Sequence, residues 1–275
     1  MIKFKNINWY LYYGALIPKV PPHYEITLTK KEQKELLKIS RALFLRYTNE
    51  WDRDGGEFWY IIKDKYEKLE DYNSNNRRKI RKGLKNCIVK KVNIETISNY
   101  GYEVYITAMN KYKTTLNIVS EEEFKKNKVS SKNYDFWAVY NKDNIMIAYS
   151  SNKVEDNSCN YMEIKFHPDY LRFYSSYAIF SEMNRYYINE KKLLYVNDGA
   201  RSISHETNIQ QYLEDKFDFR KAYCKLNVIY RWDIGLAVKI LYPFRGVFNF
   251  KNSSLLQKIS VILKQEEIRR SFEKY

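Results

Sequence analysis

The sequence predicts a layered α+β (α/β) fold, in which a mixed β-sheet is flanked by helices. First, hydrophobic residues make up 44% and aromatic residues 17% of the 275 residues, with only 8 Gly and 5 Pro. That composition supplies a large core and excludes a mainly disordered or collagen-like chain. Second, short apolar runs alternate with segments of helical period. Third, the second half runs hairpin, strand, helix, strand, helix, strand, which implies parallel strands joined by right-handed crossovers.

The elements of the first half follow from apolar spacing and from cap or turn residues at their ends. We expect strands over Asn8–Leu16, Glu57–Lys63 and Ile88–Ile94, and helices over Thr29–Tyr47, Asn73–Cys87 and Ile94–Thr114, with a short helix from Ser120.

The second half has a more regular pattern. Asn141, Lys142 and Asp143 separate two short apolar runs and predict a hairpin. We expect strands over Tyr134–Tyr140, Asn144–Ser150, Tyr161–Phe166, Leu193–Asn197 and Lys221–Tyr230, and helices over Tyr170–Asn189 and Ser204–Phe217. The predicted domains are an N-terminal strand-helix extension packed on the main domain (1–56), the main domain (57–231) and a C-terminal helical extension (232–275).

The charge is uneven along the chain. Lys and Arg number 48 against 33 Asp and Glu, a formal charge of +15, and most of the excess is dispersed lysine. Between Asn73 and Ile94, however, eight basic residues occur without an acidic one. Arg77, Arg78 and Arg81 lie there on one amphipathic helix, and guanidinium groups match phosphate well. This helix either holds an anionic ligand, binds RNA or membrane phosphates, or is a solvated face.

Signals for compartment and metal are few. The first residues lack a cleavage site of a signal peptide, and no apolar run is long enough to span a membrane. Cys87, Cys159 and Cys224 form no CxxC pair, and three histidines show no zinc-ligand spacing. We expect a cytoplasmic protein without a metal, in which Cys159 is an exposed thiol in a polar loop.

The segment DGARSISHETN, 198–208, follows a predicted strand and opens a helix. Loops in this position carry ligands and catalytic groups in open α/β sheets. His205 is the candidate base, with Glu206 and Asp198 as further catalytic candidates that could orient it. Arg201 and Asn208 are candidate substrate-binding residues. The alternative is a helix cap at Ser204 surrounded by solvated charges.

Three stretches resemble the GNAT acyltransferase superfamily and its FemAB-like branch of peptidyl transferases. NSNNRRKIRKGLKN is similar to the branch's basic segment that opens a helix. HPDYLRFYSSYAIFSEMNRYYINEKKLLYVNDG is similar to its strand, long helix and strand, and TNIQQYLEDKFDFRKAYCKL to the last helix and strand of the fold. The resemblance covers about Glu57 to Tyr230. It implies a GNAT-like sheet in which the strands around Glu163 and Leu194 separate into a slot lined by Arg172 and His205.

The resemblance also implies an acyl donor, acetyl-CoA or another acyl-CoA, held by Arg172 and by Arg77, Arg78 and Arg81. The family's glycine-rich phosphate cradle is missing from Asp169–Ser176. Asp218 replaces the glycine before Phe219, and Glu214 stands where many members place a tyrosine acid. A charged tRNA, which is the donor of FemAB-type relatives, therefore stays open as an alternative donor.

The sequence accordingly predicts an N-acyltransferase that moves an acyl group to an amine on a small molecule, a sugar or a cell-envelope precursor. The alternative is a non-catalytic GNAT-derived module that binds an anionic polymer or nucleic acid.

Overall fold

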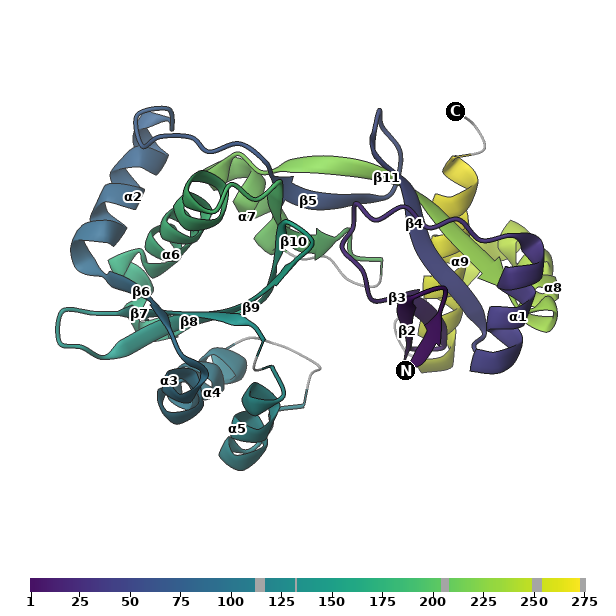
Figure 1. The fold of residues 1–275 in the computed structure, drawn as a ribbon, viewed down its shortest axis with the longest axis horizontal. Coiled ribbons are helices and arrows are strands. Elements are labelled where there is room, and N and C mark those ends of the chain that lie inside the picture. Colours follow the sequence, from purple (N-terminus) through teal and green to yellow (C-terminus); the bar gives the residue numbers. More distant parts are fainter. Residues whose placement is uncertain (112–116, 132, 204–207, 249–253, 273–275) are drawn as a thin grey trace. The chain divides into compact units, whose positions relative to one another are not determined.

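The computed structural model describes residues 1–111, 117–131, 133–203, 208–248 and 254–272 (Figure 1). Its strands form the predicted mixed sheet flanked by helices, eleven strands in the order β1-β2-β3-β4-β11-β5-β10-β9-β8-β7-β6. The strands are Ile2–Phe4 (β1), Ile7–Tyr12 (β2), Ala15–Pro18 (β3), Phe44–Arg53 (β4), Trp59–Lys63 (β5), Ile88–Val92 (β6), Asp135–Tyr140 (β7), Met146–Glu155 (β8), Ser158–Phe166 (β9), Tyr195–Ala200 (β10) and Arg220–Tyr230 (β11).

The helices confirm most of the predicted helical segments. The α-helices are Lys30–Ser40 (α1), Ser74–Asn86 (α2), Ile94–Tyr100 (α3), Tyr102–Lys111 (α4), Glu121–Val129 (α5), Ser175–Asn184 (α6), Asn208–Phe217 (α7), Trp232–Leu241 (α8) and Ser254–Ser271 (α9). Two 3-10 helices, Pro168–Phe173 (η1) and Tyr242–Phe248 (η3), and one π-helix, Arg185–Glu190 (η2), complete the set among the described residues.

The chain divides into two compact units. Unit 1 comprises Met1–Ile61, Ala200–Asn208 and Lys221–Tyr275, and unit 2 comprises Ile62–Gly199 and Ile209–Arg220. The division into domains at residues 56 and 231 stays a prediction.

In unit 1, β1, β2 and β3 are antiparallel neighbours, β3 runs parallel to β4, and β4 pairs with β11 in antiparallel fashion. Trp9, Leu36 and Leu45 are fully buried in one core cluster beneath α1. The capping box of Thr29 and Glu32 starts α1 as predicted.

Two predictions for unit 1 are wrong in their bounds. The single strand over Asn8–Leu16 is a hairpin, because Tyr13 and Gly14 take left-handed backbone conformations at φ 47° and 83°. The helix predicted to reach Tyr47 ends at Ser40, because Arg41 is also left-handed at φ 55°. The residues after it enter β4, where packing overrides their helical spacing.

In unit 2, β6, β7, β8 and β9 form an antiparallel meander, and β10 pairs with β9 in parallel fashion. Figure 1 shows α2 and α6 on one side of β7–β9, and α3, α4 and α5 on the other. Helix α6 is buried along most of its length, and α2 packs against it. The opposite layer buries Tyr105, Phe124 and Tyr149 in one cluster.

Three expectations for unit 2 need correction. The long helix predicted from Ile94 breaks at Gly101, whose close approach to the Ile97 carbonyl leaves no room for a Cβ. The helix predicted from Tyr170 begins at Ser175, after η1, and its last part is the π-helix η2. Cys159 is a buried residue of β9 and not an exposed loop thiol, and burial raises its pKa well above the ordinary value.

The contact between α2 and α6 depends on Gly83. A Cβ at this position would lie 2.6 Å from the Tyr174 carbonyl oxygen and 3.1 Å from the Ala178 nitrogen, both backbone atoms. Gly83→Ala should therefore lower the free energy of unfolding by about 1–2 kcal/mol, although alanine favours helix.

Gly235→Ala in α8 is the matched control, since its Cβ would meet only the Tyr230 Cβ at 3.4 Å. It should gain about 0.5–1 kcal/mol from helix propensity alone. Urea unfolding measures both changes. A Gly83→Ala protein as stable as the control would contradict the close packing of α2 on α6.

Candidate functional site

The central feature of unit 2 is that β9 and β10 separate after a short parallel contact. Tyr195, Val196 and Asn197 pair with Ser158, Cys159 and Asn160. Strand β9 then continues to Phe166 and β10 to Ala200, with no further pair between them among the described residues. The far edge of β9 stays paired with β8 throughout. The two strands therefore stop pairing after this contact, which leaves backbone groups of β9 after Asn160 without a partner on β10. The slot around Glu163 and Leu194, lined by Arg172 and His205, stays a prediction.

Asn197 closes the paired part of the two strands. Its side chain is 1% exposed, and Nδ2 donates to the Cys159 carbonyl oxygen at 3.2 Å. Its Oδ1 accepts the Gly199 N–H at 3.1 Å, and Gly199 is left-handed at φ 87°. The carboxamide thus bridges a carbonyl oxygen inside the paired segment and the amide of Gly199, at which β10 takes a left-handed conformation that glycine permits.

A β-bulge lies on β9 inside the separated region. Ser151 of β8 faces Glu163, whereas the next residue, Asn152, faces Tyr161, so Met162 is the extra residue. A bulged residue is left without a partner in the ladder, and bulges are frequent beside active sites. The backbone at Met162 is therefore the candidate donor to a ligand carbonyl between the strands.

Asp198 follows directly after the last paired residue of β10. Burial raises its pKa from 3.8 to about 7. Burial raises the pKa of the Tyr161 phenol well above its ordinary value, and the charge of Asp198 adds to this effect. A carboxylate with this pKa accepts protons at neutral pH, which is the property of a general base.

Tyr161 links the separation to α6. Its hydroxyl donates to Oδ1 of Asn184 at 2.8 Å, and both side chains are buried. Nδ2 of Asn184 is buried and finds no acceptor among the residues the structure describes. Asn184 ends α6 where the π-helix η2 begins, and π-helical turns occur often at functional sites. Asp198, Tyr161, Asn184 and the bulge at Met162 are the candidate active site.

A buried lysine lies on another strand of the same unit. Lys63 ends β5 at 1% exposure and forms an ion pair with Glu67. Burial lowers its pKa to about 8, against the opposing influence of Asp218 and Asp64. Asp218, which replaces the family's glycine, is left-handed at φ 53°. The backbone at this position thus takes a conformation that glycine adopts most easily, although the residue is an aspartate.

The N-terminus of α6 packs against α2. Ser175 is 1% exposed, and its hydroxyl has no partner within the described part of the chain. Gly83 of α2 packs against the Tyr174 carbonyl directly before it. The cationic side chains that could hold phosphates lie on α2.

Helix α2 carries a basic groove of about 330 Å³, lined by Ser74, Arg77, Arg78, Arg81, Lys82 and Lys85. None of its five cations forms an ion pair with a carboxylate of the described residues. Arg77 donates to the Glu70 carbonyl oxygen at 3.1 Å and Arg78 to Asn75 Oδ1 at 3.3 Å, so both keep donors for a ligand. The structure therefore brings the three predicted arginines together, with two lysines that add to the charge.

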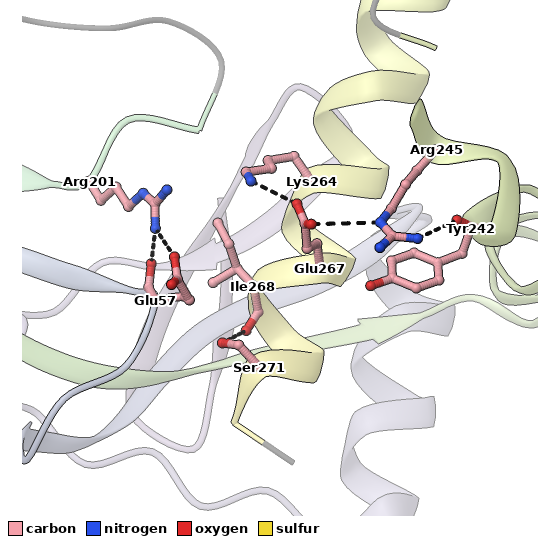
Figure 2. Close-up of polar contacts among 8 residues, drawn as sticks. All are labelled: Glu57, Arg201, Tyr242, Arg245, Lys264, Glu267, Ile268 and Ser271. Carbon is pink, nitrogen blue, oxygen red and sulfur yellow. Dashed lines mark hydrogen bonds and ion pairs between the residues drawn. The ribbon is translucent and has the colours of Figure 1, made fainter. Parts of the chain in front are cut away.

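Arg201 is already bound within unit 1. Figure 2 shows its Nη1 reaching both the carbonyl oxygen and Oε2 of Glu57, at 2.5 and 2.6 Å. Nearby, Glu267 binds Lys264 at 2.7 Å and Arg245 at 3.6 Å. These side chains border a second hollow, of about 270 Å³, in which both signs of charge alternate. The Glu57 carboxylate neutralises the charge of Arg201, whose Nε and Nη2 keep donors for a ligand.

The other predicted site residues are dispersed or undescribed. Arg172 lies exposed at the end of η1, over the ring of Phe173, and does not line the α2 groove. Asn208 is the exposed first residue of α7. His205 and Glu206 lie outside the described residues, so their roles stay predictions.

Sequence reasoning missed Asn197, Tyr161 and Asn184. Asn197 could have been found, since it directly precedes the aspartate and glycine already singled out. Tyr161 and Asn184 carry no local signal, because their contact joins a strand to a helix 23 residues later.

Two features are absent from the described residues. No group of three or more His, Cys, Asp or Glu within them could hold a metal ion. No helix within them is long and apolar enough to cross a membrane.

The raised pKa of Asp198 predicts how the stability of the fold depends on pH. Below pH 4 the group is protonated in both states. Between pH 4 and 7 the folded state keeps a proton that the unfolded state releases, so stability falls as the pH rises. Asp198→Asn removes this loss. The free energy of unfolding of the variant, relative to that of the wild type, should therefore increase by about 1–3 kcal/mol when the pH is raised from 4 to 8.

Urea unfolding at both pH values measures the difference. Asp156→Asn, in the exposed turn between β8 and β9, is the control and should follow the wild type. A pH-independent difference between Asp198→Asn and the wild type would show that Asp198 is not buried as described.

Comparison with known proteins supports the fold. No family model and no curated protein matches the sequence. Among solved structures, FemX aligns with a TM-score of 0.56 at 10% identity, over 77% of each chain. The C-terminal domain of a protein named as a lysylphosphatidylglycerol synthetase, from Agrobacterium fabrum, aligns at 0.55 and 12%, over 86% of this chain and 84% of that one. L-PGS from Bacillus licheniformis aligns at 0.52 and 11%, over 96% and 86%. The chain therefore has the GNAT-like fold of these structures.

Proposed function

We propose that this chain is a GNAT-like transferase, which moves an acyl or aminoacyl group from an activated donor to an amine. The observation that carries the proposal is the separation of β9 and β10, with Asp198 at its closed end. The fold shared with FemX, with L-PGS and with a protein named as a lysylphosphatidylglycerol synthetase supports a transferase of this kind.

In this proposal the separated strands position the reaction. The free edge of β9 binds the extended arm of the donor, and the backbone N–H at the Met162 bulge stabilises the developing oxyanion. Asp198 accepts the proton of the attacking amine. The C–N bond forms, the bond between the acyl carbon and its sulfur or oxygen breaks, and the leaving atom takes up a proton. His205 and Glu206 stay proposed as further proton-transfer groups.

The donor is proposed to carry phosphate groups, because the α2 groove gathers five cations and no acid. Both an acyl-CoA and a charged tRNA have this chemistry. The missing glycine-rich cradle at Asp169–Ser176 favours a donor that needs no pyrophosphate cradle there. Arg172 is proposed as an additional phosphate contact.

The acceptor is proposed to be an amine on a small molecule, a sugar or a cell-envelope precursor. Arg201 and Asn208 are proposed to contact the acyl acceptor. An acidic group of that molecule would compete with the Glu57 carboxylate for Arg201.

A second candidate function is a non-catalytic module that binds an anionic polymer. The cation-lined groove on α2, together with the missing glycine-rich cradle, favours it. It differs from the first in requiring no role for Asp198.

Asp198→Asn should lower kcat/KM by at least about a hundredfold, because the asparagine cannot accept a proton. The wild-type rate should rise with pH through an apparent pKa near 7, and the variant should lose this limb. Transfer assays with a panel of amines measure both. Asp156→Asn should keep the wild-type profile. Full activity of Asp198→Asn, with an unchanged pH profile, would reject the assigned base.

The triple variant Arg77→Ala, Arg78→Ala and Arg81→Ala should weaken donor binding by about tenfold or more. If the donor is tRNA, the slope of log K against log salt should fall by about 2, from three lost phosphate contacts. If it is acyl-CoA, only the CoA affinity should change.

Lys30→Ala, Lys31→Ala and Lys34→Ala on α1 remove the same charge and should leave both affinities unchanged. Equal losses in the two triple variants would mean that net charge, and not the groove, attracts the donor. Tight polymer binding without transfer to any amine would favour the second function.

A further inference from the structure

Helix α8 of unit 1 exposes an apolar face. Trp232, Leu236, Ile240 and Phe244 are spaced by four residues, and 55–81% of each is exposed. In α8 this spacing places the first three side chains on one stripe, which the turn at η3 extends to Phe244. Val238, on the opposite face, is 5% exposed and anchors the helix to the unit. An exposed stripe of this size usually marks an interaction surface.

The attachment of α8 leaves this stripe unobstructed. The Arg231 N–H donates to the Leu43 carbonyl oxygen at 2.9 Å, which ties the start of the helix to the residue before β4. At the other end, the Tyr242 ring lies 3.9 Å from the Arg270 guanidinium of α9. Both contacts come from residues outside the stripe, so the fold holds the helix without covering its apolar face.

The part of the sequence that contains the stripe has a positive net charge. From Lys221 to Tyr275 the sequence has eleven Lys and Arg and four Asp and Glu. The one acidic residue of α8, Asp233, is paired with Arg231 through two contacts of 2.7 Å. Lys239 lies exposed beside the stripe. An apolar face bordered by cations is typical of helices that lie in the surface of anionic membranes.

We propose that α8 and η3 dock unit 1 on a membrane surface that contains anionic phospholipids. Trp232, Leu236, Ile240 and Phe244 enter the boundary between headgroups and acyl chains, and Trp232, at the start of the helix, takes the interfacial position that tryptophan favours. Lys239 contacts the lipid phosphates. The proposal is independent of the transferase function, since it uses no residue of the candidate active site.

Charge decides against a second copy of this chain as the occupant. Unit 1 carries 22 Lys and Arg against 12 Asp and Glu, so two copies facing each other at this surface would repel. The same excess attracts an anionic bilayer.

The test compares two lysine substitutions in the full chain. Ile240→Lys lies in the stripe, and Ile39→Lys lies on α1, where the isoleucine is 50% exposed. Both add one positive charge, which by itself strengthens binding to an anionic surface. Weaker binding of Ile240→Lys can therefore come only from the lost apolar contact. Circular dichroism melting confirms that both variants fold.

Co-sedimentation uses phosphatidylcholine vesicles with and without phosphatidylserine. We expect the wild type to bind the anionic vesicles, Ile240→Lys to bind about tenfold or more weakly, and Ile39→Lys to bind as tightly as the wild type or tighter. The emission of Trp232 should shift to the blue on binding, and Trp232→Phe should abolish this shift.

Three results would overturn the proposal. The wild type could fail to bind anionic vesicles, or the two lysine variants could bind them equally well. Light scattering without vesicles could instead show a wild-type dimer that Ile240→Lys converts to a monomer, which would assign the stripe to self-association.

Discussion

The hydrogen bond from Asn197 to the Cys159 carbonyl oxygen is the contact on which the candidate site depends. Two parallel strands that start to pair normally continue to do so, because every unpaired backbone group between them costs free energy. Here the pairing ends at Asn197, whose buried side chain binds a carbonyl oxygen of β9 and the amide of the left-handed Gly199 on its own strand. The separation of β9 and β10 is therefore built into the sheet, and it does not require a ligand to open it.

The chemistry of the site follows from that separation. Asp198 is placed where protein atoms shield it from water but the ladder offers it no cation, and desolvation alone raises its pKa into the neutral range. The positive charge lies elsewhere in the unit, on the outer face of α2, and the Gly83 contact with α6 holds this face in place. A proton acceptor and an anion-binding groove are thus built from different elements of one unit, as a transferase with a phosphate-bearing donor requires.

The sequence predicts features that depend on neighbouring residues and misses those that depend on distant ones. Thr29, Asn73 and Ser120 were predicted to begin helices, and their side chains do cap α1, α2 and α5. Asp198 and the three arginines of α2 were recognisable from position and residue type. The end of α1 at Arg41, the burial of Cys159 and the contact of Tyr161 with Asn184 come from packing between segments far apart in the chain. No local pattern encodes them.

Hydrogen exchange of the β9 amides, measured residue by residue with and without donor, tests the central claim most directly. If the donor binds between the separated strands, exchange from Tyr161 to Phe166 should slow on addition of an acyl-CoA or a charged tRNA, while the paired amides of Ser158 to Asn160 stay unchanged. Donor binding that protects α2 alone, and leaves β9 after Asn160 exchanging as in the free protein, would contradict the account.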